Sequence, residues 1–407
     1  MLLLILGGQE EHDDREEEVK KRRSRTSTSS SAIIFKMAEF HQLRSLKADD
    51  DDVEDEDGGD DGVDGRRRHR RTLRRRRRRQ LWTAWESEAE NLARREPSAE
   101  LPSLDHLRMS DYDAVYEPAD DTYLLVDALR YELNNNKNNN TPSSTFLQER
   151  WNHRNRPYLT ILEIGCGTGV PSVFFRMEWS RTMARRMRMQ EQQEHQGQQD
   201  DKSSSDDREP PTTSPPSPTL LSYATDVNPE ALRVARETAE ANLGCGCGNG
   251  NGRGDGDFFF ELVRCDLASA LLPRLRGQVD VLIFNPPYVP TPDEEVYGCG
   301  SGGGNSGGIE ASWAGGKDGR AVVDRSVEQL GRLLRRPTGV GYLVTVDDNR
   351  PLDLAEKFRR EAELDMRPLF RRKARNEHLT VQKLTCAVPD DEEEEEGEGE
   401  GEGEQTP

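Results

Sequence analysis

The chain has 407 residues, of which 32% are hydrophobic and 33% are charged, and this composition excludes a globule folded over its whole length. Its formal net charge of −20 comes from two acidic blocks, 49–64 and 390–404, with 11 acidic residues each, so the other 55 acids nearly balance the 57 bases. The charge therefore points to no particular class of partner. No apolar run approaches a membrane span, and we expect a soluble protein without a membrane partner.

Residues 1–104 have the pattern of a disordered arm. An acidic block is followed by 66–79, where 11 of 14 residues are arginine, and blocks of like charge repel each other and stay extended. The arginine run is typical of a nuclear-localisation or nucleic-acid-binding patch, or of a solvated arm that the acidic block neutralises. We expect a short helix only over Leu81–Arg95, and an arm that activity does not require.

The folded region is predicted over 105–388. A helix is expected at 123–129, where Pro118, Asp120 and Asp121 suit its N-terminus. The pattern of Thr160–Gly165 predicts the first core strand. A glycine-rich turn follows it in the sequence, and then a helix that runs to about Arg186. We interpret about 187–219, rich in Gln, Ser, Asp and Pro, as a low-complexity insertion.

Strands and helices alternate through the rest of this region. Strands are predicted at 222–227, 258–265, 279–285, 341–346 and 378–385, and helices at 229–243, 318–336 and 352–364. Such alternation favours a Rossmann-like, doubly wound α/β sheet that is mostly parallel, with the last strand antiparallel at an edge. An acidic tail, 389–407, is predicted to be disordered.

The turn after the first strand reads E-x-G-x-G-x-G from Glu163 to Gly169. Glycines such as Gly165 and Gly167 let the backbone turn sharply and approach a ligand closely. The spacing differs from the G-x-G-x-x-G of dinucleotide enzymes, and Glu163 lies on the strand itself. An acid there suits a cofactor with an amino-acid end and a sulfonium cation.

Two acids end the next two strands. The carboxylate of Asp226 could accept hydrogen bonds from both hydroxyls of a ribose, and that of Asp266 could accept one from an adenine amino group. Leu267 adds an apolar edge and a backbone N–H beside that base. Alone, each aspartate is more typical of a helix cap or a solvated loop residue, but two acids at the carboxyl ends of successive strands favour a ligand site.

The most specific signal is Asn285-Pro286-Pro287-Tyr288, at the end of the fourth strand. An amide or exocyclic amine nitrogen is a poor nucleophile because its lone pair is delocalised. The side-chain oxygen of Asn285 and the carbonyl of Pro286 can accept its N–H bonds, and Tyr288 can stack on the planar group. Two prolines, of which Pro287 is the second, hold this geometry rigid. We therefore predict that this loop binds a substrate through a planar nitrogen and catalyses a reaction at that atom.

The six cysteines form no C-x-x-C pair, so we predict reduced thiols and no metal site. This cysteine usage favours a protein of the cytoplasm or the nucleus. The scattered histidines suggest no nucleophilic triad.

These motifs together resemble the eukaryotic HemK-type methyltransferases that modify the glutamine of the GGQ motif in the termination factor eRF-one. The resemblance rests on stretches 115–122, 161–170, 224–230, 280–290 and 309–320. It implies a seven-stranded class I fold and S-adenosylmethionine (SAM) as cofactor. It also implies SAM binding by Thr122, Glu163, Gly165, Asp226, Asp266 and Leu267, with Asn285 touching both SAM and the substrate amide.

The resemblance further implies two protein partners, a release factor as substrate and a small zinc-binding activator subunit that covers an apolar sheet edge. The NPPY loop alone leaves other acceptors open, namely adenine in DNA or RNA and a protein lysine. Nucleic acid is therefore a secondary candidate partner, with the arginine run as its main support.

Overall fold

The computed structural model describes residues 62–134, 158–200, 219–244, 259–292, 309–374 and 377–387. The chain divides into two compact units, Met1–Thr72 and Leu73–Pro407. Only the start of helix α2 (Gly62–Arg95) represents the first unit among the described residues. The second unit carries the sheet and its helices. None of the helices in these ranges has the length and hydropathy needed to cross a bilayer.

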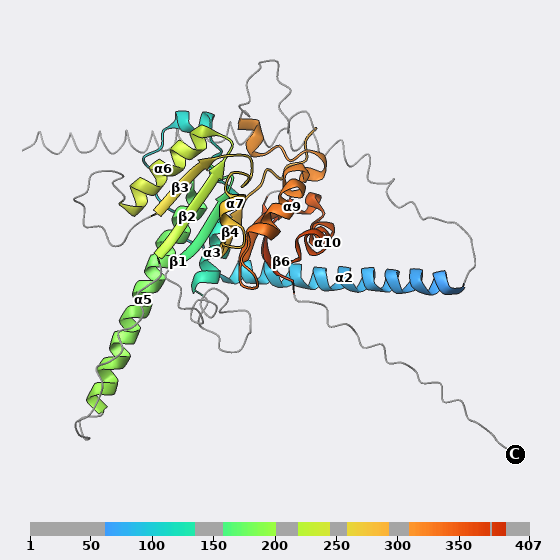
Figure 1. Cartoon of the computed structure of the whole chain (residues 1–407), viewed down its shortest axis with the longest axis horizontal. Helices are drawn as coiled ribbons and strands as arrows, with labels where there is room; N and C mark the ends of the chain where they lie inside the picture. The colour runs from blue at the N-terminus through green and yellow to red at the C-terminus, as the bar shows by residue number, and fades with distance from the viewer. Residues whose placement is uncertain are drawn as a thin grey trace, which may run out of the picture. The chain divides into compact units, whose positions relative to one another are not determined.

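A mixed sheet of seven strands forms the centre of the second unit (Figure 1). Its strands are β1 (Tyr158–Ile164), β2 (Thr219–Asp226), β3 (Phe259–Arg264), β4 (Val281–Phe284), β5 (Val340–Val346), β6 (Leu364–Ala374) and β7 (Glu377–Cys386). They are ordered β3-β2-β1-β4-β5-β7-β6, with β1 to β5 parallel and β7 antiparallel to both of its neighbours. The predicted seven-stranded, mostly parallel α/β fold of class I methyltransferases is confirmed.

One detail of the predicted edge is wrong. The late strand is antiparallel as expected, but β6 pairs along its outer side, so β6 is the edge strand. Its sequence, LDMRPLFRRKA, mixes apolar and basic residues and contains Pro368. A proline breaks the alternation that marks a strand and is tolerated at an edge, and the register shifts between Pro368 and Phe370.

Alternating side chains of the core strands supply two apolar layers. Ile161 and Ile283 pack with α3 (Asp120–Asn134) and α5 (Val170–Asp200) on one face. Leu162 and Leu282 pack on the other face with three further helices: α7 (Leu272–Leu275), α9 (Ala321–Leu333) and α10 (Pro351–Ala362). This is the burial pattern of a doubly wound sheet, in which successive residues of a central strand face opposite layers.

Shorter elements complete the domain. Helix α6 (Pro229–Leu243) begins as predicted, because the side chain of Asn228 accepts from the N–H of Glu230, and it ends at Gly244 with φ 66°. Helix α5 runs to Asp200 rather than ending near Arg186, so the start of the predicted insertion is helical and 201–218 lie outside the described residues. Four short 3₁₀ helices are η1 (Met109–Asp113), η2 (Ile309–Ser312), η3 (Lys317–Gly319) and η4 (Asp347–Asn349).

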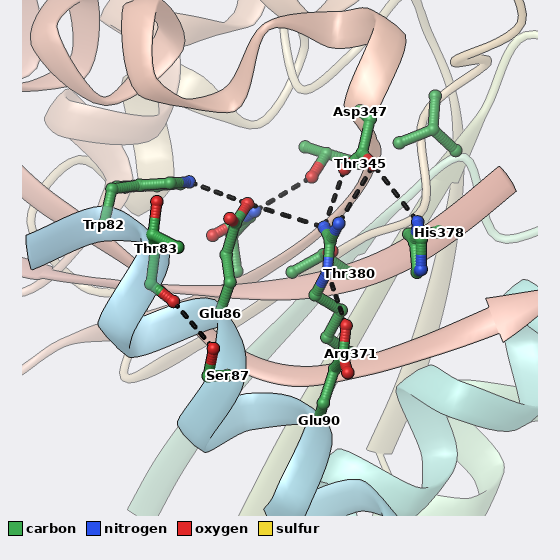
Figure 2. Close-up of polar contacts among 12 residues, drawn as sticks. Trp82, Thr83, Glu86, Ser87, Glu90, Thr345, Asp347, Arg371, His378 and Thr380 are labelled. Atoms are coloured by element: carbon green, nitrogen blue, oxygen red, sulfur yellow. Dashed lines mark hydrogen bonds and ion pairs between the residues drawn. The ribbon is translucent and has the colours of Figure 1, made fainter. Parts of the chain in front are cut away.

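The short helix expected over Leu81–Arg95 is present, but α2 already begins at Gly62, so the prediction of disorder before Leu81 is wrong from Gly62 on. Helix α2 buries Trp82, Ala89 and Ala93 against the domain. Its Glu86 and Glu90 lie 3.5 and 3.4 Å from the buried guanidinium of Arg371 on β6 (Figure 2).

Arg371 in turn binds both carboxylate oxygens of Asp347 in η4, at 2.7 and 2.9 Å (Figure 2). A buried cation needs such partners, and the acids of α2 help supply them. Local sequence could not indicate this docking, because Arg371 lies about 280 positions after its partners in α2. Residues 1–61, the acidic tail from 389 on and the short stretches between the described ranges lie outside the described residues.

Candidate functional site

The glycine turn after β1 leaves open space where a ligand is expected. Gly165 and Gly167 have φ values of 66° and 51°, and a Cβ built on either would meet no atom within 4 Å. Left-handed backbone of this kind favours glycine. The turn therefore offers bare backbone at the carboxyl end of β1, as the predicted cofactor site requires.

Glu163 lies just before this turn and is buried. Its Oε2 accepts a hydrogen bond at 3.1 Å from the N–H of Ser172, in the first turn of α5. Burial raises the pKa of Glu163 to about 8, with a smaller contribution from the charge of Asp226. A buried acid near a cofactor cation would be held ionised by that cation.

Asp226 is oriented by backbone donors. Its Oδ2 accepts from the N–H of Gly167 at 3.0 Å and its Oδ1 from the N–H of Asn228 at 2.8 Å. Burial raises its pKa, and these hydrogen bonds oppose the rise. Because each carboxylate oxygen can accept more than one bond, the group can still accept from two neighbouring hydroxyls.

The third strand end is less enclosed. Asp266 is exposed and makes a bidentate ion pair with Arg325, at 2.9 and 3.1 Å. Leu267 is buried, has φ 51°, and its carbonyl accepts from the hydroxyl of Thr225 at 2.6 Å. Leu267 is thus buried next to Asp266, while Arg325 competes for the carboxylate of Asp266.

The central feature of the site is the pair formed by Asn285 and Asp121. The amide nitrogen Nδ2 of Asn285 donates to Oδ2 of Asp121 at 3.0 Å. The amide oxygen Oδ1 of Asn285 is buried and has no hydrogen-bond partner. A buried oxygen without a donor is costly, so this atom fits a site for an incoming N–H.

Asp121 itself is held by four donors. Its Oδ1 accepts from the N–H and the hydroxyl of Thr122, at 2.7 and 3.3 Å, and its Oδ2 also accepts from the hydroxyl of Tyr288 at 3.2 Å. Burial raises the pKa of Asp121, and these hydrogen bonds oppose that rise. Since a carboxylate only accepts, it keeps the amino group of Asn285 turned toward itself.

The expected stacking role of Tyr288 does not fit the geometry. Its ring is buried in the apolar core, and its hydroxyl binds Asp121. Pro286 is buried and Pro287 half-buried beside it. The side chain of Tyr288 therefore supports Asp121 instead of covering a substrate group. Local pattern could not reveal this, because α3 supplies the buried acid from a distant part of the chain.

A second loop closes on the NPPY loop so tightly that two of its positions admit only glycine. A Cβ on Gly315 would lie 2.7 Å from the carbonyl oxygen of Pro287, and one on Gly319 would lie 1.9 Å from that of Tyr288. The N–H of Gly315 donates to the carbonyl of Val289 at 2.8 Å. This contact gives the 309–320 stretch a physical role, which is to fix the backbone of the acceptor loop.

Asn349 joins these two loops to η4. Its buried Nδ2 donates to the carbonyls of Tyr288, Asp318 and Gly319, at 2.9, 3.0 and 3.3 Å, and its Oδ1 accepts from Val346 at 2.8 Å. Sequence reasoning missed Asn349, and it treated Asp121 only as a helix-start residue. A single asparagine after a strand carries no local signal of such a role.

The surroundings of Tyr288 are acidic. Burial, together with the charges of Asp348 and Asp121, raises the pKa of Glu377 to about 7. The charge of Glu377 also contributes to raising the pKa of Tyr288. Within the described ranges, no group of His, Cys, Asp and Glu side chains has the arrangement of a metal site.

Comparison with known proteins gives a consistent set of relatives, although no protein-family model matches the chain. The methyltransferase HEMK2 of Mus musculus is 33% identical over 258 residues, which are 63% of this chain and 84% of the relative. The eRF1 methyltransferase catalytic subunit mtq2 of Schizosaccharomyces pombe is 27% identical over 283 residues, 70% of this chain and 94% of the relative. Among solved structures, the E. cuniculi Mtq2–Trm112 complex for eRF1 methylation is 23% identical, covers 67% of this chain and 99% of that chain, and gives a TM-score of 0.32.

Proposed function

This chain belongs to the HEMK2 and Mtq2 family of methyltransferases, and from that premise we propose that it methylates a glutamine side-chain amide in a translation release factor, with SAM as donor. The observation that carries the proposal is the buried, unpartnered Oδ1 of Asn285, beside a bare glycine turn. An amide nitrogen as acceptor presents the N–H that this oxygen lacks.

The cofactor supplies an electrophilic methyl group on a sulfonium. The residues that would hold it are Thr122, Glu163, Gly165, Gly167, Asp226, Asp266, Leu267 and Asn285. The open space over the glycine turn and the fixed carboxylate of Asp226 fit such a ligand. Glu163, buried and raised in pKa, would face the cationic end.

The chain's own part in the reaction is orientation. Oδ1 of Asn285 would accept an N–H of the glutamine amide and turn its nitrogen toward the methyl group. Asp121 holds Asn285 in this orientation, and the contacts from Gly315, Gly319 and Asn349 hold the loop. Charge that develops on nitrogen in the transition state would be stabilised by the acidic surroundings. The extra proton can leave to solvent after transfer.

The same acidic surroundings favour a protein acceptor over nucleic acid. The charges of Asp348 and Asp121 raise the pKa of Glu377, and those of Asp121 and Glu377 raise the pKa of Tyr288. A nucleotide substrate would bring phosphates into this field, which costs free energy. A lysine would suit the charge, but it arrives as an ammonium and needs a base first, whereas an amide needs only the acceptor that Asn285 offers.

An activator subunit is proposed for the β3 edge of the sheet. β3 is the outermost strand there, its residues are half-buried or exposed, and Phe259 is 37% exposed. Val227, which follows the carboxyl end of β2 and so lies at the other end of this edge from Phe259, is 44% exposed. An apolar, unpaired edge of this kind is normally covered by a partner. The fission-yeast relative, called a catalytic subunit, is consistent with such an arrangement.

One experiment separates the acceptors. The purified chain, with its activator, is incubated with methyl-labelled SAM and, in parallel, with release factor, a release factor whose GGQ glutamine is replaced by leucine, single-stranded nucleic acid and histone. Label on release factor alone, lost in the leucine variant, is the expected result. Label on nucleic acid or on histone lysine instead would overturn the proposal.

A further inference from the structure

The outer face of α2 is the most strongly charged surface that the methyl-transfer site does not use. One stripe of the helix docks on the domain through Trp82, Ala89 and Ala93. Arg75 lies seven residues, about two turns, before Trp82 and so on the same stripe. Arg75 is nevertheless exposed. The helix has therefore left the domain by this turn, and its side chains there face solvent.

The last five of six consecutive arginines occupy this turn and the next. Arg75–Arg79 are all exposed, and at 3.6 residues per turn they point in every direction around the helix. Arg78 has a salt bridge of 3.0 Å with the exposed Glu356 of α10. Across the ranges that the structure covers, the other four guanidinium groups of this run have no acidic partner. A surface with this much unneutralised charge attracts polyanions.

Apolar and aromatic side chains adjoin the arginines. Leu81 is 47% exposed and Trp85 is 36% exposed. Arg77, Leu81 and Trp85 follow each other at four-residue spacing and share one face of the helix. The ring of Trp85 makes an edge contact with the buried Trp82, with centroids 6.2 Å apart. This contact steadies the indole of Trp85, and the exposed part of the ring remains accessible to a stacking base.

We propose that this surface of α2, defined by Arg75–Arg79, Leu81 and Trp85, is a binding site for single-stranded nucleic acid. All its cations are arginines, whose planar fork pairs with phosphate through two parallel hydrogen bonds. Arg78 faces α10, and the other four arginines spread the charge over the remaining sides of the helix, where a flexible strand can bind. Bases unstacked from such a strand can stack on Trp85.

An acidic peptide is the competing ligand, because it shares the charge of the phosphates. It would pair with the arginines but would gain nothing from the exposed ring of Trp85. None of these residues belongs to the acceptor loop. Because the acidic surroundings of Tyr288 repel phosphates, the bound strand would hold the enzyme near nucleic acid without being its methyl acceptor.

The test is fluorescence anisotropy of a labelled 20-nucleotide single-stranded RNA and the matching DNA, titrated with the full-length chain. Replacing Arg75–Arg79 together by Gln should weaken binding at least tenfold at about 0.1 M salt. It should also make the slope of log K against log salt shallower by about 2 to 3, because fewer phosphates are neutralised. Gln has nearly the helix propensity of Arg, so the helix should survive.

A charge-matched control and a stacking variant sharpen the result. The control replaces five exposed arginines elsewhere by Gln: Arg274, Arg276, Arg332, Arg360 and Arg367. It should change binding less than threefold. Trp85→Ala should weaken RNA binding about tenfold and leave binding of a labelled polyglutamate peptide unchanged.

Three results would overturn the proposal. One is binding that the five-arginine and control variants weaken equally, which would mean a general charge effect. Another is tighter binding of polyglutamate than of either nucleic acid at equal salt. The third is an unchanged affinity for RNA in Trp85→Ala. Tighter RNA than DNA binding, or the reverse, would identify the nucleic acid within the proposed class.

Discussion

The carboxylate of Asp121 accepts a hydrogen bond from Nδ2 of Asn285 at 3.0 Å, across 164 positions of sequence. This bond turns the amide oxygen of Asn285 away from Asp121, where it is buried without a partner. The first turn of α3 thereby orients the residue at the end of β4 that we assign to the acceptor amide.

The first prediction concerns Asp121→Asn. The substituted side chain keeps its shape but loses the charge that fixes the amide of Asn285, so kcat should fall about a hundredfold while KM for SAM changes little. Steady-state kinetics with release factor measures both. Asp120→Asn, at the exposed neighbouring position, is the matched control and should retain activity within threefold. Equal losses in the two variants would contradict an orienting role for Asp121.

The second prediction uses two glycines with the same backbone conformation. Gly319 and Gly277 have φ values of 65° and 64°, but a Cβ on Gly319 would meet the carbonyl of Tyr288, whereas one on Gly277 would meet nothing within 4 Å. Gly277→Ala should cost only the left-handed strain, about 1 kcal/mol. Gly319→Ala should also displace the acceptor loop and abolish measurable methyl transfer.

Thermal melts and single-turnover transfer distinguish these two effects. If Gly319→Ala transferred methyl as fast as Gly277→Ala, the packing of the 309–320 stretch on the NPPY loop would not matter for the reaction.

The third prediction is a pH dependence of stability. The pKa of Glu163 is about 8 in the folded chain against an ordinary value of 4.5, so between these values the folded state keeps a proton that the unfolded state releases. The contribution of this group is therefore present below pH 4.5 and is lost as the pH rises toward 8, by roughly 1 kcal/mol per pH unit.

Glu163→Gln should remove this slope. Urea unfolding of the ligand-free protein at several values between pH 5 and pH 8 should show the variant gaining stability relative to wild type as the pH rises. If the difference in unfolding free energy between the variant and wild type stayed constant across this pH window, the pKa of Glu163 would not be shifted.

The fourth prediction revises the domain boundary. Deleting residues 1–72 should leave folding and methyl transfer intact, whereas deleting 1–104 should destabilise the domain, because it removes Trp82 and the acids that pair with Arg371. Trp82→Ala should cost about 3–5 kcal/mol of unfolding free energy. Trp85→Ala, at an exposed position of the same helix, should cost less than about 1 kcal/mol. Equal stability of the two truncations would mean that α2 contributes nothing.

Sequence patterns predicted the parts of the fold that local chemistry dictates. The structure confirms three elements that carry their own local signal, namely the strand predicted at 279–285, the helix at 229–243 and the late strand at 378–385. Strand β6 was not predicted, because Pro368 and the basic residues of this strand mask its alternation of apolar and polar side chains. The part of α2 before Leu81 escaped prediction because blocks of like charge argue locally for an extended chain. The contacts from distant β6 that anchor the helix also carry no local signal.

The site divides in the same way. Asn285, Glu163 and Asp226 lie in recognisable motifs at strand ends, and the parallel sheet brings those ends to one edge. Asp121 and Asn349 could not be singled out, because their roles exist only where separate segments meet. The stacking expected of Tyr288 was wrong for the same reason, since the buried acid that takes up its hydroxyl comes from another element.

The central claim is that Oδ1 of Asn285 grips the acceptor amide, and its most direct test is Asn285→Ala. Calorimetry should give SAM binding within about fivefold of wild type, because the other cofactor contacts remain, while single-turnover transfer of labelled methyl to the release-factor glutamine should fall below detection. Methyl transfer at the wild-type rate by this variant, with SAM bound, would contradict the account.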